Sequence, residues 1–223
     1  MIAGAGAKAA ARERSQAMTD SYSQPSALLA GVVLSGGRSV RFGGEKAAAL
    51  LAGRPLIMWA VLRLQRTCAS VAVNTRAGTA AENLAREAGL PVVFDAPGDA
   101  AGPLAGVKAG LVWARERGAL ALAVSPCDAP LLPQDLFARL ADAAGTGAAM
   151  AETADGPQPL CAIWPVSSLA ALSEALAGGA HPATWRMLES LGARRVRFAA
   201  EAFANLNTRA DLEAVAARFP LSR

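Results

Sequence analysis

The sequence predicts an α/β domain with a mostly parallel sheet and helices on both of its faces. Short apolar runs of strand length alternate with segments whose apolar residues recur at helical spacing. Glycine or proline separates many of these segments. Alternating strands and helices in this order are typical of a parallel sheet.

The first half of the chain contains four strand–helix units. Leu28–Leu34 is an apolar run, and Pro55–Arg66 carries apolar residues at helical spacing after a proline suited to a first turn. The second strand is Ser70–Asn74, and the helix Thr79–Gly89 ends at a glycine. The last two units are the strand Pro91–Phe94 with the helix Leu104–Arg117, which Gly118 stops, and the strand Ala119–Val124 with the helix Pro133–Ala144.

The alternation loosens after Gly145. We expect two strands around the turn-rich connection "TADGPQP", followed by two helices, a strand and a closing helix. Thr208 is suited to cap the closing helix. These elements are the strands Ala148–Glu152, Leu160–Trp164 and Arg194–Phe198, and the helices Ser167–Ala177, Thr184–Leu191 and Thr208–Arg218.

Length and composition indicate one domain over residues 27–223, because 53% of the 223 residues are hydrophobic and no linker interrupts the pattern. Residues 1–26 are mostly small and polar and lack the apolar core of a signal peptide, so we expect a disordered extension. Met18 is an alternative start within it.

Charge and residue usage argue against several functional classes. The net charge of +4 is spread out, with no basic block of the kind that binds nucleic acid, and no run approaches the roughly 20 apolar residues of a membrane helix. Cys68, Cys127 and Cys161 form no CxxC pair, which argues against a disulfide framework and a zinc site. His181 is the single histidine, so a histidine-rich metal cluster is excluded and a Ser-His-Asp triad is disfavoured. We expect a cytoplasmic protein that binds neither nucleic acid nor membrane.

Polar residues follow each of the first four predicted strands. In open α/β sheets, ligands bind beyond the carboxyl ends of the strands, so these residues form a candidate site. Taken singly, each could be an ordinary turn former or helix cap. The four strand ends carry Ser35, Gly36, Gly37 and Arg38; Asn74, Thr75 and Arg76; Asp95; and Ser125, Pro126, Cys127 and Asp128.

The loop after the first strand has the composition of a phosphate-binding loop. Gly36 and Gly37 allow backbone N–H groups to approach an oxyanion, and Arg41 and Lys46 add positive charge. Lys46 precedes alanine, so the loop is no Walker A motif, and it holds no GxGxxG. Asp128 offers the hard oxygen ligand that Mg²⁺ takes beside substrate phosphates.

The loop "LSGGRSVRFGGEK" resembles the LAGGxSxRMGxxK signature of the nucleotidyltransferase superfamily. With "GPLAG" (Gly102–Gly106), "SPCDAP" (Ser125–Pro130) and "NLNT" (Asn205–Thr208), the chain resembles the molybdenum cofactor guanylyltransferase family over about residues 30–218. The resemblance implies a three-layer, Rossmann-like nucleotidyltransferase fold. It also implies transfer of GMP from Mg²⁺·GTP to molybdopterin with release of pyrophosphate.

The resemblance also implies residue roles. Leu34, Ser35, Gly36 and Gly37 would hold the nucleotide with Asn74 and Asp95, and Lys46 and Arg41 would act on the phosphates. Asp128 would bind both magnesium and the GTP phosphates. Guanine presents N–H donors, which suits an acidic acceptor such as Asp95.

Departures from the family pattern leave alternatives open. Arg41 and Lys46 are closer together than in many guanylyltransferases, a spacing shared with molybdopterin cytidylyltransferases, so CTP remains a candidate, as does a sugar phosphate acceptor. A non-catalytic nucleotide or cofactor carrier is the alternative of a different class, although a carrier needs neither Lys46 nor Asp128. Ser35 and Ala129 replace commoner residues without a consequence for metal binding.

The acceptor is expected to approach from the later half of the chain. Gln158 and Pro159 on the turn-rich connection, with Asn205 and Asn207, are the candidate acceptor-binding residues. The two asparagines serve equally as turn formers before a Thr208 cap. Trp185 and Arg186 suit a planar anionic pterin, but Trp185 at helical spacing with Leu188 favours a core position. We expect a monomer, with molybdenum-insertion proteins or apo-molybdoenzymes as further partners.

Overall fold

The computed structural model describes residues 26–36, 42, 44–99, 102–177 and 181–217. The predicted disordered extension, Gly37 and Arg41 therefore lie outside the described residues, apart from Ser26. The strands are β1 (Ser26–Leu34), β2 (Leu50–Leu51), β3 (Arg54–Pro55), β4 (Cys68–Asn74), β5 (Val92–Val93), β6 (Ala121–Pro126), β7 (Ala149–Thr153), β8 (Gly156–Pro165) and β9 (Arg194–Arg197).

The α-helices follow the strands in the predicted order. The α-helices are α2 (Leu56–Gln65), α3 (Ala80–Glu87), α4 (Pro103–Glu116), α5 (Leu136–Ala144), α6 (Leu169–Leu176), α7 (Thr184–Ser190) and α8 (Arg209–Ala216). Short 3-10 helices are η2 (Lys46–Ala48), η3 (Val166–Ser168) and η4 (Ala200–Phe203).

A mostly parallel sheet forms the centre of the molecule, which confirms the predicted fold class. Its strand order is β5-β4-β1-β6-β8-β7-β9. β8 runs antiparallel to its neighbours β6 and β7, while the pairs β4–β5, β1–β4, β1–β6 and β7–β9 are parallel. β1 therefore lies in the middle of four parallel strands, where its carboxyl end is flanked on both sides.

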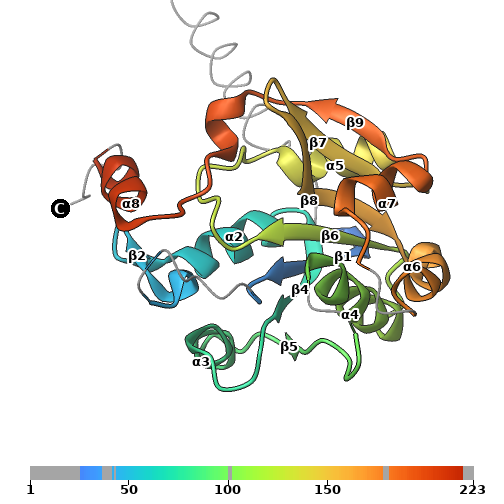
Figure 1. Ribbon diagram of the computed structural model, residues 1–223, viewed down its shortest axis with the longest axis horizontal. Coiled ribbons are helices and arrows are strands. Elements are labelled where there is room, and N and C mark those ends of the chain that lie inside the picture. The colour runs from blue at the N-terminus through green and yellow to red at the C-terminus, as the bar shows by residue number, and fades with distance from the viewer. Residues whose placement is uncertain (1–25, 37–41, 43, 100–101, 178–180, 218–223) are drawn as a thin grey trace, which may run out of the picture.

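Helices cover both faces of the sheet (Figure 1), because successive residues of each buried strand face opposite sides. Val33 packs in a core with Ile57 of α2 and Phe137 of α5. Its neighbour Val32 packs in a second core with Leu111 of α4 and Trp164 of β8. The apolar runs of the sequence thus supply both cores.

Local signals in the sequence set several element boundaries. Thr79 caps α3 by accepting a hydrogen bond from the backbone N–H of Glu82, and Gly89 follows the helix at φ 68°. Thr208 forms a capping box with Asp211 at the start of α8, as predicted. The α5 cap position belongs to Asp135, so Asp128 is left for another role.

The predicted connection "TADGPQP" is mostly strand, which corrects the expectation for Gln158 and Pro159. β8 begins at Gly156, and its first residues pair with β7 alone, because the ladder to β6 covers Ala162–Pro165. The register between β7 and β8 shifts here, because the consecutive residues Met150 and Ala151 pair with Ala162 and Gln158, so the extra residues, Pro159 among them, lie on β8. Proline is accommodated at such irregular or edge positions, so turn-forming residues continue the strand here.

The β2–β3 hairpin was not predicted, because two-residue strands leave no periodicity in the sequence. Its turn residues Ala52 and Gly53 have φ angles of 50° and 77°. Leu51 of the hairpin packs in a small core with Leu206 and with Val215 of α8. Figure 1 shows α8 beside β2, away from the main sheet.

No helix in the described part of the chain is long and apolar enough to cross a membrane.

Candidate active site

The carboxyl ends of β1, β4, β5 and β6 meet at one edge of the sheet, as predicted. Leu34 pairs with Asn74 of β4 on one side and with Pro126 of β6 on the other. Asn74 pairs in turn with Val93 of β5. Polar residues after these strands therefore start from the same level of the sheet.

Asn74 and Asp95 form a hydrogen-bonded pair at this edge. The Asn74 side-chain amide donates to the Asp95 carboxylate (2.8 Å) and to the carbonyl oxygen of Val93 (3.3 Å). Asn74 is 4% exposed, so its amide is held within the protein. The structure thus joins two residues that sequence reasoning assigned to the nucleotide.

The glycines of "GPLAG" leave room for neighbouring side chains. A Cβ on Gly106 would lie 2.3 Å from Oδ1 of Asn74 and 2.9 Å from Cδ2 of Leu34. A Cβ on Gly102 would lie 2.1 Å from Nε2 of His181. The first turn of α4 can therefore approach Leu34 of β1 and Asn74 of β4 only because Gly106 lacks a side chain, and His181 can approach the start of α4 only because Gly102 does.

Lys46 and Asp128 form an ion pair at the end of β6. The Lys46 Nζ donates to Oδ2 of Asp128 at 2.6 Å and to Oδ1 of Asn207 at 3.0 Å. The side chains of Lys46 and Asp128 are 11% and 21% exposed, so the pair is only partly shielded from water. Three segments that are distant in sequence converge on one ammonium group.

Hydrogen bonds to the backbone fix Asp128 and Asn207, the two residues whose oxygens accept from Lys46. The carbonyl of Asp128 accepts from the N–H of Leu206 (2.9 Å), which ties the two loops together. Asp211 accepts from the N–H groups of Asn207 and Thr208 (2.8 Å each), and these bonds hold its pKa below the ordinary value. The capping box of α8 thereby positions Asn207 as well as the helix.

The donor set at Lys46 suits a divalent cation. An Asp128 carboxylate and an Asn207 amide oxygen already converge on one cation, and Mg²⁺ takes such oxygen ligands together with substrate phosphates and water. Among the described residues, no group of three or more His, Cys, Asp or Glu side chains forms a metal cluster. Substrate phosphates and water would complete the coordination shell beside Asp128 and Asn207.

Ser35, Gly36 and Cys127 line the start of the same edge. The N–H of Ser35 donates to the carbonyl oxygen of Asn74 (2.9 Å), and Gly36 is exposed beside it. Burial raises the pKa of the Cys127 thiol to about 12, and the Asp128 carboxylate adds to the effect. Cys127 is thus a neutral, partly buried residue that packs against the core next to Asp128.

The candidate acceptor residues do not form one group. The Gln158 amide donates to the Thr153 hydroxyl (3.2 Å) within its own hairpin. Asn205 is exposed, whereas Asn207 joins Lys46. Trp185 is only partly buried and lies 5.1 Å from the Arg186 guanidinium, so its expected core position is wrong; Leu188 takes that position instead.

Sequence reasoning gave no role to Glu45. Its carboxylate accepts from the backbone N–H groups of Ala80 and Ala81 at the start of α3. The only signal in the sequence was an acidic residue between a glycine pair and Lys46.

Comparison with known proteins agrees with this geometry. The family model described as "MobA-like NTP transferase domain" matches residues 31–196. A molybdenum cofactor guanylyltransferase of Cereibacter sphaeroides is 39% identical over 188 residues, which span 82% of this chain and 93% of that protein. A protein of the same name from Acidiphilium cryptum is 38% identical over 194 residues, 85% of this chain and 94% of the relative.

A solved structure with a related name has a similar fold. The molybdopterin-guanine dinucleotide biosynthesis protein A of Archaeoglobus fulgidus is 25% identical, with a TM-score of 0.65 over 85% of this chain and 100% of that chain. Three observations agree on the family: the site at the strand ends, the family model that matches most of the chain, and relatives well above 30% identity. The chain belongs to the MobA-like NTP transferase family and is a nucleotidyltransferase.

Proposed function

We propose that the protein transfers GMP from Mg²⁺·GTP to molybdopterin and releases pyrophosphate. The observation that carries the proposal is the placement of Lys46, Asp128 and Asn207 at the sheet edge that also holds the Asn74–Asp95 pair. Cation-binding oxygens, a phosphate-binding ammonium and a base-binding carboxylate then lie along one strand edge. The names of the curated relatives support guanine as the base and molybdopterin as the acceptor.

The nucleotide would lie over the ends of β1, β4 and β5. Asp95 supplies an acceptor for the N1–H and N2–H₂ donors of guanine, and the hydrogen bond from Asn74 fixes its carboxylate. Leu34, Ser35 and Gly36 would border the sugar and phosphates. Gly37 and Arg41 belong to the same proposed loop but lie outside the described residues.

Charge neutralisation would be the main contribution to the reaction. When bound, Mg²⁺ would supply Lewis-acid stabilisation of the charge on the triphosphate, held by Asp128. Lys46 would bind phosphate oxygens as a compact point charge. Because the acceptor's terminal phosphate is already ionised, its in-line attack on the α-phosphorus requires no general base.

Ligand-induced stabilisation followed by turnover tests the proposal. With Mg²⁺ present, GTP at about 100 times its Kd should add about 2.7 kcal/mol of stability, and ATP, CTP and UTP should add less. Pyrophosphate release should then require molybdopterin. If CTP stabilised the protein more than GTP, CTP would be the substrate. Nucleotide binding without pyrophosphate release would indicate a carrier. Gel filtration and cell fractionation would test the expected monomer and its cytoplasmic location.

A further inference from the structure

Lys46 starts from a segment with little stability of its own. η2 is three residues long, and 3-10 helices of this length have poor hydrogen-bond geometry. The position of the Lys46 backbone therefore depends on what holds the neighbouring residues. Ala47 is buried in the main core, but its methyl group is a small anchor.

Glu45 provides a second anchor directly before Lys46. One oxygen of its carboxylate, Oε2, accepts from the N–H groups of both Ala80 and Ala81. These are among the first N–H groups of α3, which have no partner within the helix and lie at its positive end. Glu45 thus connects η2 to a helix 35 residues further along the chain.

The two adjacent residues hold this segment from opposite ends. Glu45 fixes the main chain to α3, while Asp128 and Asn207 fix the tip of the Lys46 side chain. A triphosphate and its metal would draw both Lys46 and Asp128 into new contacts. The anchor at Glu45 involves neither of these two side chains, so new contacts to the ligand would not need to break it.

We infer that Glu45 is a positioning residue that sets where the Lys46 ammonium meets the triphosphate. The inference rests on the role proposed above for Lys46. A displacement of about 1 Å can cost about 100-fold in rate, so an anchor next to a charge-stabilising lysine affects turnover more than binding. The competing explanation is that Glu45 only caps α3.

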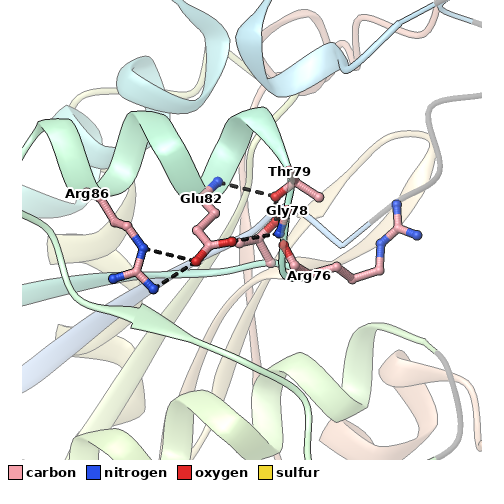
Figure 2. Close-up of polar contacts among 6 residues, drawn as sticks. Arg76, Gly78, Thr79, Glu82 and Arg86 are labelled. Carbon is pink, nitrogen blue, oxygen red and sulfur yellow. Dashed lines mark hydrogen bonds and ion pairs between the residues drawn. The ribbon is translucent and has the colours of Figure 1, made fainter.

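Glu82 is the matched control for that explanation. It is also a glutamate at the start of α3, and its Oε2 accepts from the backbone N–H of Gly78 (2.8 Å). Figure 2 shows Glu82 between Gly78 and Arg86, with Thr79 capping the helix. Removing Glu82 weakens the same helix end without touching the segment that carries Lys46.

The experiment compares Glu45→Ala and Glu45→Gln with Glu82→Ala. We expect Glu45→Ala to lower kcat about tenfold or more while the KM for GTP changes less than about threefold. Glu82→Ala should keep a near-normal kcat despite a similar fall in melting temperature, about 2–4 °C. Both bonds go to one oxygen of Glu45, so the amide oxygen in Glu45→Gln should restore most of the lost kcat.

A second measurement tests the position of the Lys46 side chain and does not depend on enzyme activity. Lys46 is acylated with an amine-reactive reagent, and the extent of labelling is measured by peptide mass spectrometry. Lys108, paired with Asp99, is the internal reference. Labelling of Lys46 relative to Lys108 should rise about fivefold or more in Glu45→Ala and stay unchanged in Glu82→Ala.

The outcomes separate this inference from the proposed function. Equal kcat values and equal Lys46 labelling in Glu45→Ala and Glu82→Ala would overturn the positioning role. A wild-type protein without transferase activity would overturn the proposed function, and the labelling comparison would still decide whether Glu45 positions Lys46.

Discussion

Gly106→Ala should destabilise the protein and remove nucleotide binding together. The new methyl group would lie 2.3 Å from Oδ1 of Asn74, whose amide is committed to Val93 and Asp95. Such overpacking costs about 1–3 kcal/mol. Disturbing the buried Asn74 bonds adds about 1–3 kcal/mol. The better helix propensity of alanine returns about 1 kcal/mol.

The middle of these ranges gives a net loss of about 3 kcal/mol in the free energy of unfolding. For a chain of this size, that loss corresponds to a fall of about 6–12 °C in melting temperature. Gly110→Ala is the matched control one turn along α4, where the methyl group would meet apolar side-chain atoms: Leu122 Cδ2 at 2.9 Å, Val32 Cγ1 at 3.0 Å and Val32 Cβ at 3.3 Å. Its net cost should be about 1 kcal/mol.

The assay is thermal unfolding with and without Mg²⁺·GTP at about 100 times the wild-type Kd. The wild type and Gly110→Ala should both gain about 2.7 kcal/mol from the ligand, whereas Gly106→Ala should gain almost nothing. A Gly106→Ala protein with wild-type melting temperature and the full GTP-induced shift would refute the reasoning. It would show that α4 can move away from Asn74 at no cost.

Four further expectations follow from the site. Lys46→Ala should lower kcat at least about tenfold, equivalent to about 1.4 kcal/mol of transition-state stabilisation, and a change in KM alone in steady-state kinetics would make Lys46 a ground-state binder. Asp128→Ala should abolish transfer while circular dichroism shows a retained fold; near-normal turnover would remove the metal assignment. Gln158→Ala should weaken molybdopterin binding more than GTP binding in separate titrations, and equal losses would exclude this segment from the acceptor site. Because desolvation raises the pKa of Cys127 to about 12, its partly buried thiol stays protonated at pH 8 and should react with a disulfide reagent much more slowly than a free cysteine; a rate equal to that of free cysteine would contradict the raised pKa.

The sequence by itself determined the order of the strands of the main sheet and of the α-helices, and the edge at which the site forms. Apolar runs such as Leu28–Leu34 are long enough to specify buried strands, and the helix caps Thr79 and Thr208 accept hydrogen bonds from the backbone N–H groups three residues further along the chain. These signals are local, so they are visible without the fold. The parallel arrangement then follows, and with it the convergence of the residues after β1, β4 and β6.

Only the tertiary structure decided which of these residues act on one another. Asp128 lies 82 residues and Asn207 lies 161 residues further along the chain than Lys46. No local pattern indicates that an amide of the "NLNT" segment meets that lysine. Glu45 likewise reaches α3 through a contact between a side chain and a distant backbone. The strand position of Gln158 depends on pairing with β7, which outweighs its turn-rich composition. Side-chain contacts between distant segments depend on how helices and strands pack, and packing is a property of the whole chain.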